Sequence, residues 1–227
     1  MTVKQVKLSL VHKVAPPNSA ARGPHPTLVL LHGRGADEND LFGLTPYFDP
    51  RFQVISVRAP FPFPFGGHTW YEMLNVGTPE PKQFTESYDL LTRFIDDIGE
   101  QYPVDSDRLF LLGFSMGTVM SYAYSLTKPE RIRGVIAHSG YIPEDSSLVF
   151  DWKRIAGKRF FVAHGTHDPV IEVGYARRAR TLLSGASADL LYKEYAIPHS
   201  MSEESIQDIS SWLQQDLNPG RGDNDEQ

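Results

Sequence analysis

The chain has 227 residues, of which 41% are hydrophobic and 22% are charged, which is typical of a globular protein and excludes disordered or collagen-like classes. Its formal charge of −6 repels phosphate backbones and anionic membrane surfaces, so nucleic acid is not an expected partner. The chain contains no cysteine, which excludes disulfides, thiolate zinc sites and a cysteine nucleophile.

The two ends of the chain carry different signals. Residues 1–7 alternate apolar and polar side chains without the continuous apolar run of an export signal, which predicts a cytoplasmic protein. The longest apolar runs, such as 28–31 and 109–112, are far shorter than the ~20 residues that span a bilayer, so stable membrane insertion is not expected. Residues 218–227 are acidic and lack aliphatic side chains, which predicts a disordered tail after a domain of residues 1–217.

The first half of the chain predicts strands followed by a helix. Near alternation from Val3 to Val14 favours an edge strand, whereas the almost wholly apolar segments 27–32 and 52–57 are typical of strands buried on both faces. Between Phe84 and Tyr102 the apolar side chains recur at three- and four-residue spacing, which predicts one buried helix face. The apolar residues of that face are Leu91, Phe94, Ile95 and Ile98.

The second half alternates strands and helices regularly. We expect strands at 108–112, 133–138, 160–164 and 190–195, and helices at 117–126, 175–183 and 201–217. Ser200 and Glu203 have the spacing of a capping box for the last helix, whose predicted core stripe is Ile206, Ile209, Leu213 and Leu217. This order predicts an α/β fold with a doubly wound, mostly parallel sheet and a single domain.

Residues 113–117, GFSMG, form a G-x-S-x-G motif between a predicted strand and a predicted helix. A serine at such a sharp turn needs glycines two residues before and after it, because larger side chains would collide there. We therefore expect Ser115 to be an exposed nucleophile. A turn that only packs the helix against the strand is the alternative interpretation.

A serine hydroxyl needs a base to remove its proton, and the base needs a carboxylate to orient it. On the fold that carries this elbow, the chain order is serine, acid, histidine. Asp168 follows the predicted strand 160–164, and His199 lies between the last strand and the last helix, so both fit this order. The competing side chains are His138, His164, His167, Glu172 and Asp189.

The oxyanion of an acyl-transfer intermediate is stabilised by backbone amides that are already in place. One donor should be the amide of Met116, which opens a helix, and the other that of Arg34, in the glycine-rich loop 31–36 after a buried strand. A phosphate-binding loop is the alternative, but this loop lacks the Lys-Ser/Thr of a P-loop and the third glycine of a dinucleotide fingerprint. Neither a metal nor a cofactor is expected.

Four motifs together resemble the phospholipase/carboxylesterase family of α/β-hydrolases, relatives of the acyl-protein thioesterases. They are LHGRG at 31–35, GFSMG at 113–117, HGTHDPV at 164–170 and PH at 198–199, and the likeness extends from about Thr27 to Leu217. The resemblance implies a serine hydrolase with a compact site and little or no lid. It places the catalytic triad on Ser115, Asp168 and His199, and the oxyanion amides on Arg34 and Met116.

The chain departs from the family pattern just after the nucleophile. Family members commonly have glutamine and a further glycine where this chain has Met116 and Thr118. Because the oxyanion contact uses the backbone, Met116 leaves the mechanism intact and makes the pocket wall less polar.

The segment 60–71 is rich in proline and aromatic residues. The resemblance implies that Trp70 and Tyr71 form a pocket wall, with Phe63 and Phe65 contributing, while aromatic side chains that only cover the sheet edge are the alternative. A rigid apolar loop suits small acyl or aryl groups better than a long flexible chain.

These features predict a serine carboxylesterase that hydrolyses short- to medium-chain esters through an acyl-enzyme. Two other functions stay open: an acyl thioesterase or lysophospholipase acting on longer chains, and a non-catalytic binding protein on the same fold. The expected partner is a small-molecule ester, and the sequence leaves the oligomeric state open.

Overall fold

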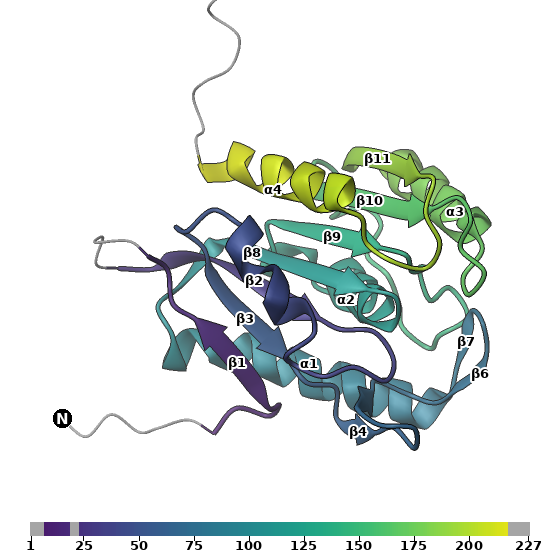
Figure 1. Ribbon diagram of the computed structural model, residues 1–227, viewed down its shortest axis with the longest axis horizontal. Coiled ribbons are helices and arrows are strands. Elements are labelled where there is room, and N and C mark those ends of the chain that lie inside the picture. Colours follow the sequence, from purple (N-terminus) through teal and green to yellow (C-terminus); the bar gives the residue numbers. More distant parts are fainter. Residues whose placement is uncertain (1–6, 19–22, 218–227) are drawn as a thin grey trace, which may run out of the picture.

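A twisted seven-stranded sheet forms the centre of the described part of the chain (Figure 1). The computed structural model describes residues 7–18 and 23–217, so the predicted tail at 218–227 lies outside the described residues. The strands are β1 (His12–Ala15), β2 (His25–Leu31), β3 (Gln53–Val57), β8 (Val104–Phe114), β9 (Gly134–His138), β10 (Arg159–Gly165) and β11 (Asp189–Tyr195).

The strand order across this sheet is β1-β3-β2-β8-β9-β10-β11. The edge strand β1 runs antiparallel to β3, and the remaining neighbours pair in parallel. The order reverses direction at β2, where the chain leaves one side of the sheet and continues on the other. The predicted doubly wound, mostly parallel sheet is therefore confirmed.

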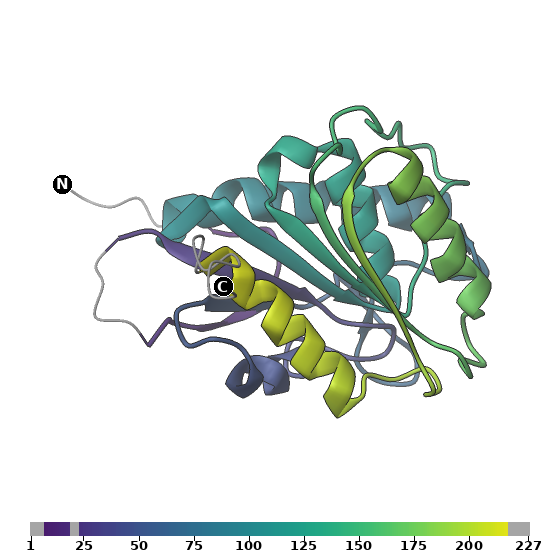
Figure 2. The ribbon, with the colours of Figure 1, turned by 90° about the horizontal axis from the view of Figure 1, so that it is seen from above.

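Helices cover both faces of the sheet (Figure 2). They are α1 (Pro81–Gln101), α2 (Met116–Thr127), α3 (Val173–Gly185) and α4 (Glu203–Leu217), with the 3-10 helices η1 (Leu41–Tyr47) and η2 (Pro129–Arg131). Successive side chains of a strand point to opposite faces, so Val29 and Leu31 pack beneath α1 to α3 while Leu28 and Leu30 pack beneath α4 and η1. No helix in the described residues is long and apolar enough to cross a membrane.

The start of α4 differs from the predicted capping box. The helix begins two residues after the expected boundary, because Ser202 and Ser205 cap each other rather than Ser200 and Glu203. The Ser202 hydroxyl accepts from the Ser205 amide at 3.1 Å, and the Ser205 hydroxyl accepts from the Ser202 amide at 3.0 Å. Ile206, which was expected on the core face, is consequently only half-buried.

The segment between β3 and α1 folds into two short hairpins beside the sheet. They are formed by β4 (Phe61–Pro62) with β5 (His68–Thr69), and by β6 (Met73–Asn75) with β7 (Thr78–Pro79). The amide of Gly35 donates to the carbonyl of His68 at 2.8 Å, and the amide of His68 donates to the carbonyl of Ala36 at 2.7 Å. The first hairpin is thus bonded to the loop that follows β2, and no helical lid interrupts the described elements.

Candidate active site

The predicted chemical groups gather at the carboxyl ends of the parallel strands. Gly33 follows β2, Ser115 follows β8, Asp168 follows β10 and His199 follows β11. Carboxyl ends of parallel strands meet at one edge of an open α/β sheet, which is where ligands bind in such folds. The topology therefore brings together residues that are far apart in the sequence.

Ser115 lies in a strained backbone conformation at the turn from β8 to α2, with φ 54° and ψ −117°. Both glycines of the motif are required by contact with neighbouring backbone. A side chain at Gly113 would collide with the carbonyl oxygen of Gly117, and a side chain at Gly117 would collide with the carbonyl oxygen of Leu31. This close approach of α2 to β2 explains the G-x-S-x-G spacing and holds the serine at the sheet edge.

The side chains of Ser115, His199 and Asp168 form a continuous hydrogen-bonded row. Nε2 of His199 lies 3.0 Å from Oγ of Ser115, and Nδ1 of His199 lies 2.6 Å from Oδ2 of Asp168. With the proton on Nδ1, His199 donates to the carboxylate and its Nε2 accepts from the serine hydroxyl. The row has the order that a serine nucleophile, its base and the orienting acid require.

The carboxylate of Asp168 is buried and held by several donors. Burial alone would raise the pKa of Asp168, but the amide of Ile171, the ring of His199 and the amide of Val170 all donate to it and lower the pKa below its ordinary value. The two amides lie 2.9 and 2.8 Å from Oδ1, which leaves Oδ2 facing His199. Asp168 therefore stays ionised at neutral pH in one orientation.

None of the competing side chains forms a hydrogen bond with Oγ of Ser115 in the described residues, although Nε2 of His164 lies 3.3 Å from Oδ2 of Asp168. His138 is fully buried, and burial lowers its pKa to about 3, so it is a neutral core ring hydrogen-bonded to serine hydroxyls. His164 is also buried and donates from Nε2 to the carbonyl of Ile171 at 2.8 Å. His167 is exposed, Glu172 lies at the start of α3, and Asp189 opens β11 at the opposite end of that strand from His199.

Three buried groups hold the loop that follows β2. His32 contacts the carbonyl of Gly33 through Nδ1 at 2.6 Å and accepts the amide of Ala59 at Nε2 at 3.0 Å. The indole Nε1 of Trp70 donates to the carbonyl of His32 at 2.9 Å. A side chain on Gly33 would lie 3.3 Å from Cβ of Ser115, so the loop passes close beside the serine.

A cavity of about 320 Å³ opens over Ser115. Its lining includes His199 and both residues predicted to supply oxyanion amides, Arg34 and Met116. Met116 is the first residue of α2, so its amide has no carbonyl partner within the helix and is free to bind an anion. The structure thus brings four predicted residues around one cavity, with a fifth, Asp168, behind His199.

None of the four aromatic residues predicted for the pocket wall lines this cavity. Trp70 and Tyr71 are fully buried in the core, Trp70 against the loop that follows β2 and Tyr71 against Phe84. Phe63 lies beneath the guanidinium of Arg34, 4.5 Å from its centre, and Phe65 is 91% exposed. The expectation was wrong in its geometry because the aromatic segment forms a hairpin that supports the neighbouring loop.

Other residues, which the sequence interpretation missed, line the cavity instead. They are Gly33, Ala36, Asp40, Met73, Phe114, Tyr141, Val170 and Ile171. Burial raises the pKa of Asp40 above its ordinary value. The one available signal was position: Tyr141 follows the end of β9, and Ile171 follows the loop that carries Asp168. In the described residues, no group of metal-ligating side chains could hold a metal ion.

The chain matches known proteins along most of its length. The sequence model of the Phospholipase/Carboxylesterase family matches residues 13–217. An acyl-protein thioesterase 1 from Candida albicans is 26% identical over 208 residues, which cover 82% of this chain and 90% of the relative. A putative hydrolase, MhqD, from Bacillus subtilis is 24% identical over 190 residues, covering 83% and 92%.

Solved structures share the fold. The carboxylesterase of Bacillus cereus superposes with a TM-score of 0.80 at 22% identity, covering 91% of this chain and 94% of that one. A carboxylesterase from Mesorhizobium loti superposes with a TM-score of 0.81 at 20% identity, covering 92% and 97%. At this level of identity the superpositions show the α/β-hydrolase fold.

Proposed function

Because this chain belongs to the phospholipase/carboxylesterase family of serine hydrolases, we propose that it is a carboxylesterase acting on short- to medium-chain esters through Ser115, His199 and Asp168. The observation that carries the proposal is the row of hydrogen bonds from Asp168 through His199 to Ser115, at 2.6 and 3.0 Å. The strained backbone at Ser115 supports it, because such strain is retained where a nucleophile must be presented.

In the proposed reaction, Oγ of Ser115 attacks the ester carbonyl while Nε2 of His199 takes the hydroxyl proton. The carbonyl oxygen becomes an oxyanion that accepts from the amides of Met116 and Arg34. The carbon–oxygen bond of the ester then breaks, and His199 returns its proton to the departing alcohol. Asp168 stabilises the imidazolium that exists between these two steps.

The acyl-enzyme is resolved by the same groups. A water molecule gives a proton to Nε2 of His199 and adds its oxygen to the acyl carbon. The bond to Oγ of Ser115 breaks, Ser115 regains a proton from His199, and the carboxylic acid leaves. The overall reaction consumes one water and yields one acid and one alcohol.

The size of the cavity supports the preference for small esters. Its volume of about 320 Å³ lies near the lower end of the range for ligand pockets, ~300–1,000 Å³. The side chains that line it include the bulky Met73, Tyr141 and Ile171. A short acyl or alcohol group fills such a space, whereas a long chain must extend beyond it.

Hydrolysis of p-nitrophenyl esters from acetate to palmitate tests the proposal, with Ser115→Ala as the control for contaminating esterases. We expect a maximum at short to medium chains that disappears in the variant. A maximum at long chains would instead favour a lysophospholipase or an acyl thioesterase, and the Candida albicans relative is named an acyl-protein thioesterase. Failure of a fluorophosphonate probe to label Ser115 would favour a non-catalytic binding protein.

The assignment of the base has its own test. We expect His199→Ala to lose nearly as much activity as Ser115→Ala, because members of a triad act as a unit. His167→Ala is the matched control, since His167 is exposed two residues after β10 and makes no contact with Ser115 in the described structure. Retained activity in His199→Ala with loss in His167→Ala would contradict the assignment.

A further inference from the structure

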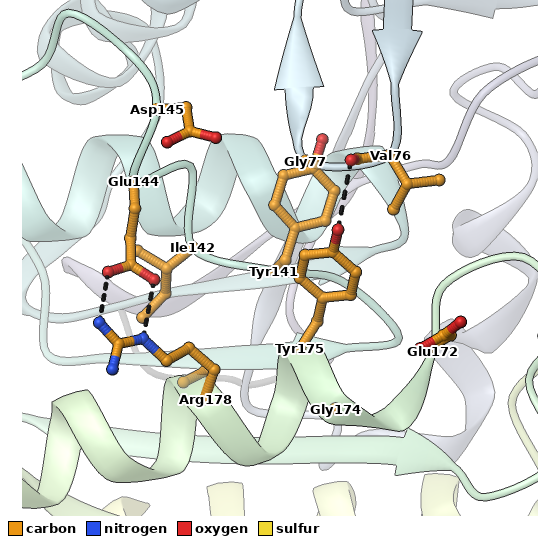
Figure 3. Close-up of a pocket in the computed structure, with 11 residues that line it drawn as sticks. Val76, Gly77, Tyr141, Ile142, Glu144, Asp145, Glu172, Gly174, Tyr175 and Arg178 are labelled. Atoms are coloured by element: carbon orange, nitrogen blue, oxygen red, sulfur yellow. Dashed lines mark hydrogen bonds and ion pairs between the residues drawn. The ribbon is translucent and has the colours of Figure 1, made fainter.

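A second cavity, of about 560 Å³, lies beside the first. Figure 3 shows its lining, with the rings of Tyr141 and Tyr175 at its centre beneath the β6–β7 hairpin. The hydroxyl of Tyr175 donates to the carbonyl of Val76 at 3.2 Å, which fastens the hairpin to α3. This cavity therefore has a fixed aromatic floor rather than a loose surface loop.

The second cavity continues the one over Ser115. Tyr141 lines both of them. Two further segments pass directly from one lining to the other, at Ile171 and Glu172 and along the hairpin from Met73 to Val76. Because the two cavities share a residue and adjoining chain segments, they are two compartments of one groove that begins at the nucleophile.

The charge of the second compartment is negative. Glu144 and Arg178 neutralise each other in a two-point ion pair, with nitrogen–oxygen distances of 2.9 and 3.1 Å. Asp145 and Glu172 also line the compartment, and in the described residues no basic side chain pairs with either of them. Asp145 and Glu172 are thus two exposed carboxylates without a basic partner in the described residues, and they lie on either side of the pair of tyrosine rings (Figure 3).

Aromatic faces beside carboxylates are suited to organic cations. Tyr175 is half-buried and its ring offers a π surface to the compartment, whereas Tyr141 is only 2% exposed and packs against Tyr175 with the ring centroids 5.4 Å apart at an angle of 44°. Ammonium groups bind such faces through the ring quadrupole, and nearby carboxylates add a Coulomb attraction. Anionic groups would be repelled, and a neutral fatty chain would gain no attraction from the carboxylates.

We propose that this compartment binds a positively charged ammonium group carried by an ester substrate whose carbonyl lies at Ser115. The inference rests on the proposed esterase function and specifies its substrate class. It makes Glu172 and Asp145 specificity-determining residues that do not take part in the bond-breaking steps. Their effect belongs to kcat/KM for cationic esters and not to hydrolysis of small neutral ones.

Ester pairs that differ only in charge test this proposal. Butyrylcholine and 3,3-dimethylbutyl butyrate differ in the alcohol, and p-nitrophenyl 4-(trimethylammonio)butyrate and p-nitrophenyl 5,5-dimethylhexanoate differ in the acyl part. We expect the cation to be preferred in at least one pair by about 3- to 10-fold in kcat/KM, as exposed cation–π and Coulomb attractions allow. The preference should shrink as salt is raised, because the carboxylates are exposed.

Variants that change one charge should move this ratio in predictable directions. Glu172→Gln and Asp145→Asn should each lower it about 2- to 3-fold, and together they should bring it close to one. Arg178→Gln frees Glu144 and should raise the ratio instead. Glu100→Gln is the matched control, since this glutamate is exposed at the far end of α1.

Two results would overturn the proposal if the enzyme still hydrolysed p-nitrophenyl acetate. One is an equal kcat/KM for the cationic and the neutral ester in both pairs. The other is a ratio of these two values that none of the charge variants changes. Absence of turnover with every ester would instead overturn the proposed function and this inference with it. Rates for p-nitrophenyl acetate and for the cationic esters should be equal in the wild type and Glu100→Gln. A loss confined to cationic esters therefore marks binding rather than damage to the triad.

Discussion

Substitution of Asp168 by asparagine should invert the proton arrangement of His199. Oδ1 of Asp168 accepts the amides of Val170 and Ile171 at 2.8 and 2.9 Å, so only an oxygen can occupy that position. In Asp168→Asn the side-chain amide oxygen takes it, and the NH₂ group then faces Nδ1 of His199. Nδ1 must accept, the ring proton moves to Nε2, and Nε2 can no longer remove the proton of Ser115.

The expected loss follows from this wrong tautomer. A positioned general base contributes about 10²–10⁴-fold, and the same carboxylate-to-amide change in a serine protease triad costs about 10⁴ in kcat. We expect kcat of Asp168→Asn to fall about 10³- to 10⁴-fold, which corresponds to roughly 4–5.5 kcal/mol of transition-state stabilisation. KM should change little, because Asp168 does not line the cavity.

Steady-state hydrolysis of p-nitrophenyl butyrate at pH 7.5 measures both constants, and thermal unfolding shows whether the variant is folded. Asp189→Asn is the control, since Asp189 is one of the two other acids considered from the sequence and lies at the start of β11. A folded Asp168→Asn enzyme that kept more than a tenth of wild-type kcat would refute the orienting role of Asp168. A loss of the same size in Asp189→Asn would do so as well.

Three further predictions concern groups that support the site. Burial lowers the pKa of His138 to about 3 from an ordinary 6.5. Between pH 3 and pH 6.5 the unfolded chain therefore binds one proton more at this residue than the folded chain does. The contribution of neutral His138 to the free energy of unfolding is complete above pH 6.5 and declines by about 1.4 kcal/mol per pH unit towards pH 3. In urea unfolding from pH 7 to 4, the free energy of unfolding should therefore fall less steeply with decreasing pH in His138→Phe than in the wild type. An equally steep fall in the variant would show that His138 is not the source of this pH dependence. Trp70→Phe removes the hydrogen-bond donor to the carbonyl of His32. This variant should lower kcat about tenfold and change KM less than twofold. An unchanged kcat would show that the indole contributes to packing alone. Thr118→Val removes the hydroxyl that lies 2.7 Å from the carbonyls of Gly113 and His138, which should cost about 1–3 kcal/mol and be seen as a drop in Tm of roughly 2–10 °C by calorimetry.

The parts of the structure that could be predicted are those with local steric or periodic causes. The elbow at Ser115 needs glycines on both sides because the first turn of α2 approaches Gly113 and the end of β2 approaches Gly117, and that need is visible in five consecutive residues. Buried parallel strands are apolar on both faces, so β2, β8 and β10 stand out as apolar runs. Once the strands were placed, their order put Asp168 and His199 at the same edge as Ser115.

The parts that could not be predicted depend on contacts between distant segments. Trp70 and Tyr71 were expected in the pocket because of the family resemblance, but both side chains are buried in the core beside the β4–β5 hairpin. Nothing in the local sequence shows that the indole of Trp70 donates to a carbonyl 38 residues earlier. The cap of α4 was misplaced for a related reason, because two serines satisfied each other's amides.

The two departures from the family pattern after the nucleophile lead to a conclusion about substrate choice. Thr118 stands where family members commonly have a glycine. Its hydroxyl lies within hydrogen-bond distance of carbonyl groups at the ends of β8 and β9, and its methyl group packs against Gly140. Thr118 therefore stabilises the fold and does not contact the reacting atoms. Met116 offers its amide at the helix start, and its sulfur accepts from the hydroxyl of Thr69 at 3.3 Å. Neither change alters the amide donors that the proposed mechanism uses, so we expect substrate choice to depend on the lining of the groove, where Met116 makes the wall of the small cavity less polar and Tyr141 joins that cavity to the second one.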